Sequence, residues 1–227
     1  MFDRIAHKYD FLNHFLSMGI DKRWRKKAIR LLSYDRPKYI LDIATGTADF
    51  AIASNRLHPH KVVGIDISEN MLKIGRNKIK KKKLEHKIEL LRHDSENLPF
   101  ANETFDAVTV AFGVRNFENL GKGLNEIYRV LKPTGSILVL EFSKPSKFGF
   151  RHLYKLYSKT LMPLIGNFLS KDKSAYTYLP ESIENFPAGM RFIDELKLAG
   201  FTENFYKKFT FGIVTAYKGK KLPDEKK

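Results

Sequence analysis

The chain has 227 residues, 43% hydrophobic and 29% charged, which is enough for one sizeable core. Lysine and arginine outnumber the acids 41 to 25, and the resulting charge of +16 indicates attraction to polyanions. The alternative is that the lysines reflect a lysine-rich genome and cover the surface of an ordinary soluble enzyme. The absence of cysteine excludes disulfides, thiol catalysis and thiolate metal sites, and the histidines give little support for a metal site.

Apolar segments of the chain alternate with helix-like segments, which predicts an α/β fold: a doubly wound, mostly parallel sheet with helices on both faces. We expect two amino-terminal helices within 3–33, and further helices at 48–57, after Ser68, at 120–131 and at 187–198. The expected strands are 39–44, 62–67, 88–91, 105–112 and 136–142, with a closing antiparallel pair at 201–206 and 210–217. These elements predict a single domain over 1–221, with amino-terminal helices in 1–34, a helical insert at 148–186 and a disordered tail at 222–227.

No apolar run approaches the roughly 18 residues of a membrane span, and the chain start lacks the apolar core of a signal peptide. We therefore expect a cytoplasmic protein that could touch the inner face of a membrane only from outside the bilayer. A lysine run at 80–83 is typical of a helix carboxyl end, where cations complement the helix dipole, although contact with nucleic acid is the alternative.

Three consecutive strand ends carry residues suited to a nucleotide-like ligand. The first strand leads into the turn Asp42–Asp49, in which Gly46 lets a ligand approach the backbone. Asp66 ends the second strand, 20 residues after Gly46, which is the spacing at which an acid accepts hydrogen bonds from ribose hydroxyls. The alternative role for Asp66 is to cap the next helix, but Ser68 already serves as that cap. Asp94 follows the third strand and could accept from an adenine amino group. Because these ends share one sheet edge, we predict a cofactor site there.

The turn after the first strand resembles the D-x-G-x-G-x-G motif of class I methyltransferases, with Ala44 and Ala48 in place of two glycines. Four longer motifs resemble the quinone C-methyltransferases of menaquinone and ubiquinone synthesis. The first runs from Tyr9 to Trp24 and follows the family pattern Y-D-x-x-N, then Ser, His and Trp, except that Asp21 replaces the histidine. The second is Phe112–Asn116 (F-G-x-R-N), and the third is Arg129–Pro145 (R-V-L-K-P-G-G…L-E-F-S-K-P), in which Thr134 replaces one glycine. The fourth is Tyr176–Ile183 (Y-x-Y-L-x-E-S-I). The resemblance covers about residues 2 to 219, and it leaves open whether residues precede Met1 in the native protein.

This resemblance implies S-adenosylmethionine as the cofactor and a lipophilic quinol as the substrate. The cofactor contacts that we expect from the motifs are Asp42, Gly46, Thr47, Asp66, Asp94 and Ser95, together with the backbone of Ala111. The expected reaction is C-methylation of demethylmenaquinol, and C-methylation of a ubiquinone precursor is the alternative.

A quinol carbon becomes a good nucleophile when the neighbouring hydroxyl is ionised. With a phenol pKa of about 10, roughly one molecule in a thousand is ionised at pH 7. Recovering that factor requires about 4 kcal/mol of stabilisation of the phenolate relative to the phenol. Arg115 is the candidate that stabilises the phenolate, and the alternative is a structural salt bridge to a nearby acid. Tyr9, Asp10, Tyr178 or a water are candidate proton acceptors, although Tyr9 and Asp10 could instead cap and pack the amino-terminal helix. No metal is required.

The insert at 148–186 is apolar and basic, so we expect it either to guide the isoprenoid tail and touch anionic lipid, through Arg151, Lys155 and Lys159, or to be an ordinary amphipathic core helix. An RNA methyltransferase would suit the charge, but no RNA-binding module is visible, so we expect no nucleic-acid partner. A non-catalytic scaffold is a further rival, against which the intact Asp66, Asp94 and 112–116 motif argue. The sequence does not determine the oligomeric state, and a homodimer is one of the options.

Overall fold

The computed structural model describes residues 19–143 and 181–222 of the chain. The candidate residues Tyr9, Asp10 and Tyr178 lie outside this range, as do the first predicted helix, nearly all of the 148–186 insert and the end of the tail. The statements below concern the described residues.

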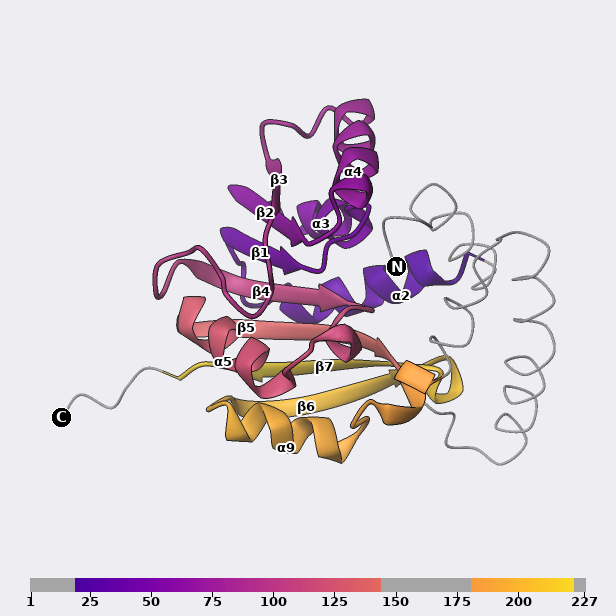
Figure 1. The fold of residues 1–227 in the computed structure, drawn as a ribbon, viewed down its shortest axis with the longest axis vertical. Helices are drawn as coiled ribbons and strands as arrows, with labels where there is room; N and C mark the ends of the chain where they lie inside the picture. The colour runs from indigo at the N-terminus through magenta and orange to yellow at the C-terminus, as the bar shows by residue number, and fades with distance from the viewer. Residues whose placement is uncertain (1–18, 144–180, 223–227) are drawn as a thin grey trace.

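A twisted seven-stranded sheet forms the centre of the described part of the molecule (Figure 1). Its strands are β1 (Tyr39–Ile43), β2 (Lys61–Asp66), β3 (Ile88–Arg92), β4 (Phe105–Ala111), β5 (Leu131–Phe142), β6 (Thr202–Phe209) and β7 (Val214–Lys220). The order across the sheet is β3-β2-β1-β4-β5-β7-β6. β1 to β5 pair in parallel, and β7 runs antiparallel between β5 and β6. The doubly wound sheet and its closing antiparallel pair are therefore confirmed.

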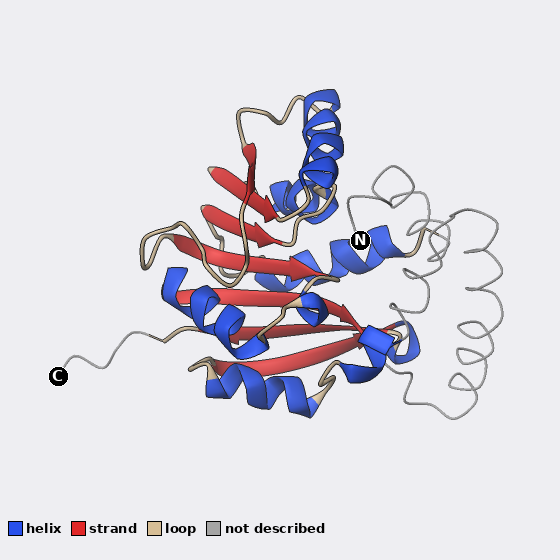
Figure 2. Ribbon diagram, viewed as in Figure 1, coloured by secondary structure: helices blue, strands red, loops and turns tan. Residues whose placement is uncertain are grey.

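Helices cover both faces of the sheet (Figure 2). One face packs against α2 (Asp21–Ile29), the 3-10 turn η1 (Arg30–Leu32), α3 (Asp49–Ser54) with η2 (Asn55–Leu57), and α4 (Glu69–Lys81). The other face packs against α5 (Leu120–Val130) and α9 (Met190–Leu198). Each layer has its own apolar cluster, because parallel strands that are buried on both sides present hydrophobic residues to both.

The helix starts follow local capping chemistry. Ser68 adopts an extended backbone and its Oγ accepts from the N–H of Met71 at 3.3 Å, so the predicted cap of α4 is confirmed. Asn119 caps α5 in the same way, its Oδ1 accepting from the N–H of Lys122 at 3.0 Å. Lys78, Lys80 and Lys81 occupy the last turn of α4, where they complement the helix dipole.

Some predicted boundaries were wrong in the carboxyl-terminal half. The closing strands are Thr202–Phe209 and Val214–Lys220, and residues 210–212, predicted to begin the last strand, form the 3-10 turn η5. Alternating Phe209, Phe211 and Ile213 imitate a strand, but Thr210 and Phe211 have positive φ angles of 45° and 55°. α9 begins at Met190 rather than at residue 187, because Gly189 is not helical. β5 begins at Leu131, earlier than the predicted residue 136.

Candidate functional site

The loop from β1 to α3 has an unusual backbone. Ala44, Gly46 and Ala48 have φ angles of 51°, 55° and 66°, which is the left-handed region that favours glycine. Ala44 and Ala48 are the two positions at which the related motif carries glycine, so alanine has kept the glycine conformation at some cost in strain. A Cβ atom on Gly46 would meet no atom within 4 Å, so the loop presents open space at this residue.

Asp42 anchors this loop to the sheet. It is fully buried, and both hydroxyl partners are 2.6 Å away: Thr45 Oγ1 donates to Oδ2, and Thr109 Oγ1 of β4 donates to Oδ1. Burial raises the pKa of Asp42 to about 6, against the opposing effect of the two hydroxyl hydrogen bonds. The carboxylate therefore ties the loop to β1 and β4.

Asp66 is held at the end of β2 by two backbone groups. Its Oδ2 accepts from the N–H of Gly46 at 2.8 Å, and its Oδ1 accepts from the N–H of Ser68 at 2.9 Å. Each carboxylate oxygen has a second lone pair, so a fixed Asp66 can still accept from a ligand hydroxyl.

A strand-end cavity of about 100 Å³ opens beside this carboxylate. Its lining includes Ala44 and Gly46 after β1, Asp66 and Ile67 after β2, His93 and Ser95 after β3, and Ala111, Phe112 and Asn116 after β4. The structure thus brings the ends of the first three strands, at which the sequence predicted a site, together with the end of β4.

Asp94 is placed differently from the other candidates. Its side chain is exposed, its Oδ1 accepts from the N–H of Glu96 at 2.9 Å, and it is not part of the cavity lining, whereas its neighbours His93 and Ser95 are. A role for Asp94 in cofactor binding stays a prediction. Among the lining residues, His93 and Asn116 were missed, although Asn116 closes the Phe112–Asn116 motif.

A smaller loop cavity of about 30 Å³ lies on the other side of Gly46. It shares Ala44, Gly46, Ala111 and Phe112 with the strand-end cavity. Its further lining is Arg25, Asp42, Thr45, Thr47, Asp49 and Phe50. The Thr47 hydroxyl accepts from Lys78 Nζ at 2.8 Å, and that ammonium also pairs with Asp49 at 2.7 Å.

Arg25 is the cation of the loop cavity, and sequence reasoning missed it because α2 carries no cofactor signal. It pairs with Asp21, and its guanidinium lies 5.5 Å from the ring centre of Phe112. The Arg25 side chain is only 11% exposed, and within the described part of the chain its Nε is a buried donor with no hydrogen-bond partner. A buried donor without a partner is costly, which makes an anionic ligand group a fitting complement.

Arg115 forms a buried ion pair with Glu141 at the end of β5. Arg115 Nη1 donates to Glu141 Oε1 and to the Phe112 carbonyl, both at 2.6 Å, and Nε donates to Ser182 Oγ at 3.3 Å. Burial raises the pKa of Glu141, and the charge of Arg115 opposes that rise. This salt bridge is the alternative role that the sequence left open for Arg115, beside contact with a phenolate. One residue can have both roles, because Arg115 also lines a cavity of about 330 Å³. This Arg115 cavity lies between 114–120 and 181–187.

The site fits a nucleoside cofactor that carries an amino-acid group. Gly46 leaves room for close approach, Asp66 offers fixed acceptors, and Arg25 offers a buried donor on the far side of the same loop. No group of three or more His, Cys, Asp or Glu side chains within 19–143 and 181–222 could hold a metal ion. No helix in the same ranges is long and apolar enough to cross a membrane.

The fold is that of class I S-adenosylmethionine-dependent methyltransferases. A methyltransferase of this kind from Thermotoga maritima aligns with a TM-score of 0.67 at 20% sequence identity, over 97% of this chain and 98% of that one. Haemonchus contortus phosphoethanolamine N-methyltransferase 2, solved in complex with S-adenosyl-L-methionine, aligns with a TM-score of 0.60 at 15% identity, over 82% of this chain and 49% of that one. At these identities the likeness shows the fold alone.

The chain belongs to the ubiE/COQ5 methyltransferase family, whose pattern it matches over residues 1–221. It is 50% identical to the demethylmenaquinone methyltransferase of Bacteroides fragilis, over 96% of this chain and 89% of the relative. It is 44% identical to the demethylmenaquinone methyltransferase of Thermus thermophilus, over 96% and 99%. A ubiquinone/menaquinone biosynthesis C-methyltransferase of Geotalea daltonii is 42% identical, over 97% and 94%. The resemblance noted from the motifs is confirmed.

Proposed function

We propose that this methyltransferase moves the methyl group of S-adenosylmethionine to a ring carbon of demethylmenaquinol. The observation that carries the proposal is the 50% identity, over 96% of the chain, to a demethylmenaquinone methyltransferase. The described site supports it, because the fixed Asp66 carboxylate and the open space at Gly46 fit the nucleoside of such a cofactor.

The chain would hold this cofactor across the β1–α3 loop. Asp66 accepts from the ribose hydroxyls, Ser95 and His93 line the cavity beside it, and Arg25 donates to the carboxylate of the amino-acid group in the loop cavity. When bound, the cofactor supplies an already activated methyl group, so that no metal is needed. Asp42, through Thr45 and Thr109, keeps the loop in place for these contacts.

The contribution of Arg115 is electrostatic. Glu141 and the Phe112 carbonyl fix the guanidinium, and an arginine side chain cannot easily serve as the base. Fixed in that way, Arg115 stabilises the quinol oxygen as its proton leaves, which raises the electron density at the neighbouring ring carbon. Tyr9, Asp10, Tyr178 or a water receives that proton, and the three side chains lie outside the described residues.

A substrate comparison tests the proposal. Labelled S-adenosylmethionine is incubated in detergent with a reduced short-chain demethylmenaquinone and, separately, with a benzoquinol analogue of a ubiquinone precursor. We expect faster label transfer to the naphthoquinol. Transfer to the benzoquinol alone would replace the proposed substrate with the ubiquinone precursor, and transfer only to RNA, run as a third arm, would overturn a quinol substrate altogether.

A further inference from the structure

The outer face of α2 is a continuous basic surface. Asp21, Trp24, Ala28 and Ile29 turn inward and are buried. The exposed residues of α2 and the start of η1 are all cationic: Lys22, Arg23, Lys26, Lys27 and Arg30. Lys22, Lys26 and Arg30 recur every four residues, so they form one stripe along the helix. Asp21, the acid of α2, is buried and paired with Arg25, so it does not neutralise this stripe.

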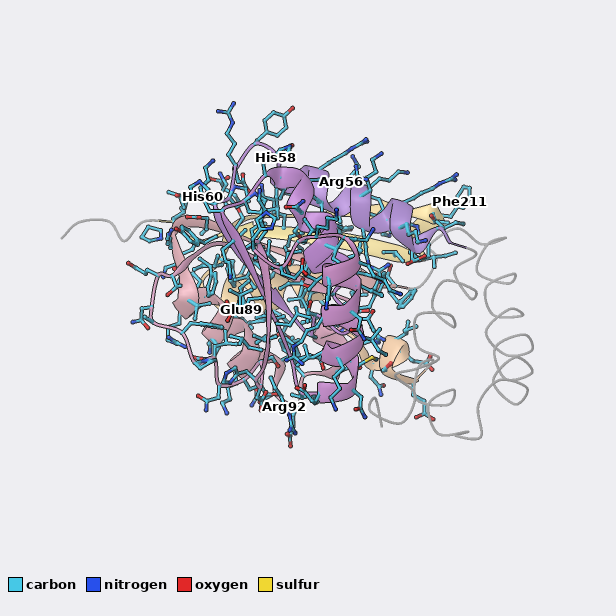
Figure 3. All side chains as sticks on the ribbon, turned by 90° about the horizontal axis from the view of Figure 1, so that it is seen from above. Arg56, His58, His60, Glu89, Arg92 and Phe211 are labelled. Carbon is cyan, nitrogen blue, oxygen red and sulfur yellow. The ribbon has the colours of Figure 1, made fainter. Side chains whose placement is uncertain are left out.

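An exposed aromatic residue adjoins the stripe. Phe211 is 53% exposed at the tip of η5, and its backbone is left-handed (φ 55°, ψ 18°), a conformation that is strained for a bulky side chain. Figure 3 shows Phe211 at the rim of the molecule, beside α2. The turn is fixed to α2, because Trp24 Nε1 donates to Thr210 Oγ1 at 2.7 Å and Lys27 Nζ lies 6.0 Å from the ring centre of Phe209.

The amino-terminal end of α2 and Phe211 lie at the edge of the sheet that carries the site. β6 runs parallel to β5, because both are antiparallel to β7, so η5 follows β6 at the same edge as the ends of β1 to β4. The beginning of α2 reaches this edge as well, where Arg25 and Trp24 contact Phe112. A membrane that contacts the start of this basic helix face and Phe211 would therefore lie beside the mouth of the site.

We propose that this α2–Phe211 surface docks the enzyme on an anionic lipid bilayer, with the cations against the headgroups and the Phe211 ring in the interface. Each lysine or arginine near an anionic lipid surface strengthens the binding of a protein to that surface about fivefold. A single exposed aromatic ring beside a basic helix face suits insertion into a bilayer, whereas RNA binding favours a groove with several stacking rings. The choice of lipid rests in part on the proposed function, since a lipophilic quinol resides in membrane.

The test is vesicle co-sedimentation of the full chain, which needs no enzymatic activity and therefore fails independently of the proposed function. Vesicles of phosphatidylcholine alone are compared with vesicles that contain about one-third phosphatidylglycerol, a fraction chosen to give a strongly anionic surface. The variant K22Q/R23Q/K26Q, called the stripe variant, removes three exposed charges of the α2–Phe211 surface. The matched control K80Q/K81Q/K82Q removes three exposed charges at the end of α4, which lies at the opposite edge of the sheet.

We expect the wild-type chain to bind the anionic vesicles only, the stripe variant to bind on the order of a hundredfold more weakly, and the control to bind within about threefold of wild type. Equal losses in both variants would mean that binding follows net charge, and would overturn the proposal. Binding that persists in the stripe variant would assign the membrane contact to another segment, and tighter, Phe211-independent binding of poly(U) at the stripe would assign the surface to RNA.

Phe211→Gly separates a docking role from a structural one. Glycine adopts φ 55° without strain, so this variant keeps the left-handed backbone of η5, and a melting curve checks that it is folded. Loss of the aromatic ring should nevertheless weaken vesicle binding about tenfold, the magnitude expected for an aromatic side chain that leaves an apolar environment. Unchanged vesicle binding in Phe211→Gly would contradict the insertion of this ring.

Discussion

At the scale of single residues, the cofactor loop depends on a fit between Ala44 and Gly113. A Cβ on Gly113 would lie 2.5 Å from the Cβ of Ala44, while its next neighbours stand at ordinary contact distances. The backbone of Gly113, at φ −119° and ψ −32°, would accept alanine. The methyl group that Ala44 carries in place of hydrogen is therefore accommodated by a glycine on the adjoining strand end.

Gly113→Ala should lower the free energy of unfolding by about 1–3 kcal/mol through overpacking. In an Ala44→Gly background the same change should cost less than about 1 kcal/mol, because the methyl group that it would clash with is gone. Urea denaturation of the four chains measures both values. An equal loss in both backgrounds would show that Ala44 is not the obstacle.

Arg115 serves both the fold and, as we propose, the chemistry, and the two contributions can be separated. Arg115→Met should destabilise the protein by about 3–5 kcal/mol, because it leaves Glu141 buried without its cation. The double variant R115M/E141Q should recover much of that stability but none of the turnover, while cofactor affinity stays close to wild type. Recovered turnover in the double variant would assign Arg115 a structural role alone.

The orphan donor of Arg25 gives a ligand-specific prediction. Arg25→Met should weaken S-adenosylmethionine binding by roughly 10- to 100-fold, the loss expected for a charge-assisted hydrogen bond. The decarboxylated cofactor, which lacks the anionic partner, should bind the variant and the wild-type chain equally. Isothermal titration with both compounds measures the difference. A parallel loss for the two ligands would indicate that Arg25 only supports the loop.

At the residue level, the sequence could place Gly46 and Asp66 at neighbouring strand ends, because each follows directly from a buried parallel strand. The structure joins them through the N–H of Gly46, which donates to Asp66 Oδ2 at 2.8 Å, and their contact with the cofactor stays a prediction. Arg25 could not be found in this way, because its part in the loop cavity depends on how α2 docks against the sheet. Asp94 and Ser95 are neighbours in sequence, yet only Ser95 lines the cavity, a difference set by the turn after β3.

At the scale of elements, α2 is joined to the sheet by the one tryptophan of the chain. Trp24 is 5% exposed, and its ring packs at 6.4 Å from Phe112 and 6.3 Å from Phe142, while its Nε1 bonds to Thr210. Because α2 shares its apolar cluster with α3 and α4, we expect this helix to unfold together with the sheet.

Tryptophan fluorescence reports on this docking directly. The emission of Trp24 and the far-UV circular dichroism should give the same urea midpoint, since both follow one cooperative transition. A fluorescence midpoint at clearly lower urea would mean that α2 leaves the sheet first, and the loop cavity would then lose Arg25 before the fold is lost.

Element prediction was strongest for the parallel strands, because a strand covered on both faces is a continuous apolar run with few alternatives. β1, β2 and β4 lie within one or two residues of their predicted bounds. The edge hairpin was placed less well. β6 is covered on its inner face only. The alternation of Phe209, Phe211 and Ile213 also continues through the turn η5, and no residue type there indicates its left-handed backbone.

At the scale of the whole molecule, the sheet order explains why one edge carries the function. The chain reverses direction across the sheet between β1 and β4, so the loops after these two strands diverge to opposite faces and leave the strand-end cavity between them. The same edge receives Arg25 from α2 and, through β6, the exposed Phe211. A cofactor site, a substrate path and a docking surface can therefore share one end of the molecule.

The reaction that we propose for this edge transfers a methyl group to a carbon atom. The most direct measurement is the bonding of the transferred methyl, read by ¹³C NMR after incubation with S-adenosylmethionine labelled at its methyl carbon and reduced demethylmenaquinone. We predict one new carbon-bound methyl on the quinone ring. An oxygen-bound methyl, or no product while the cofactor is bound, would contradict the account.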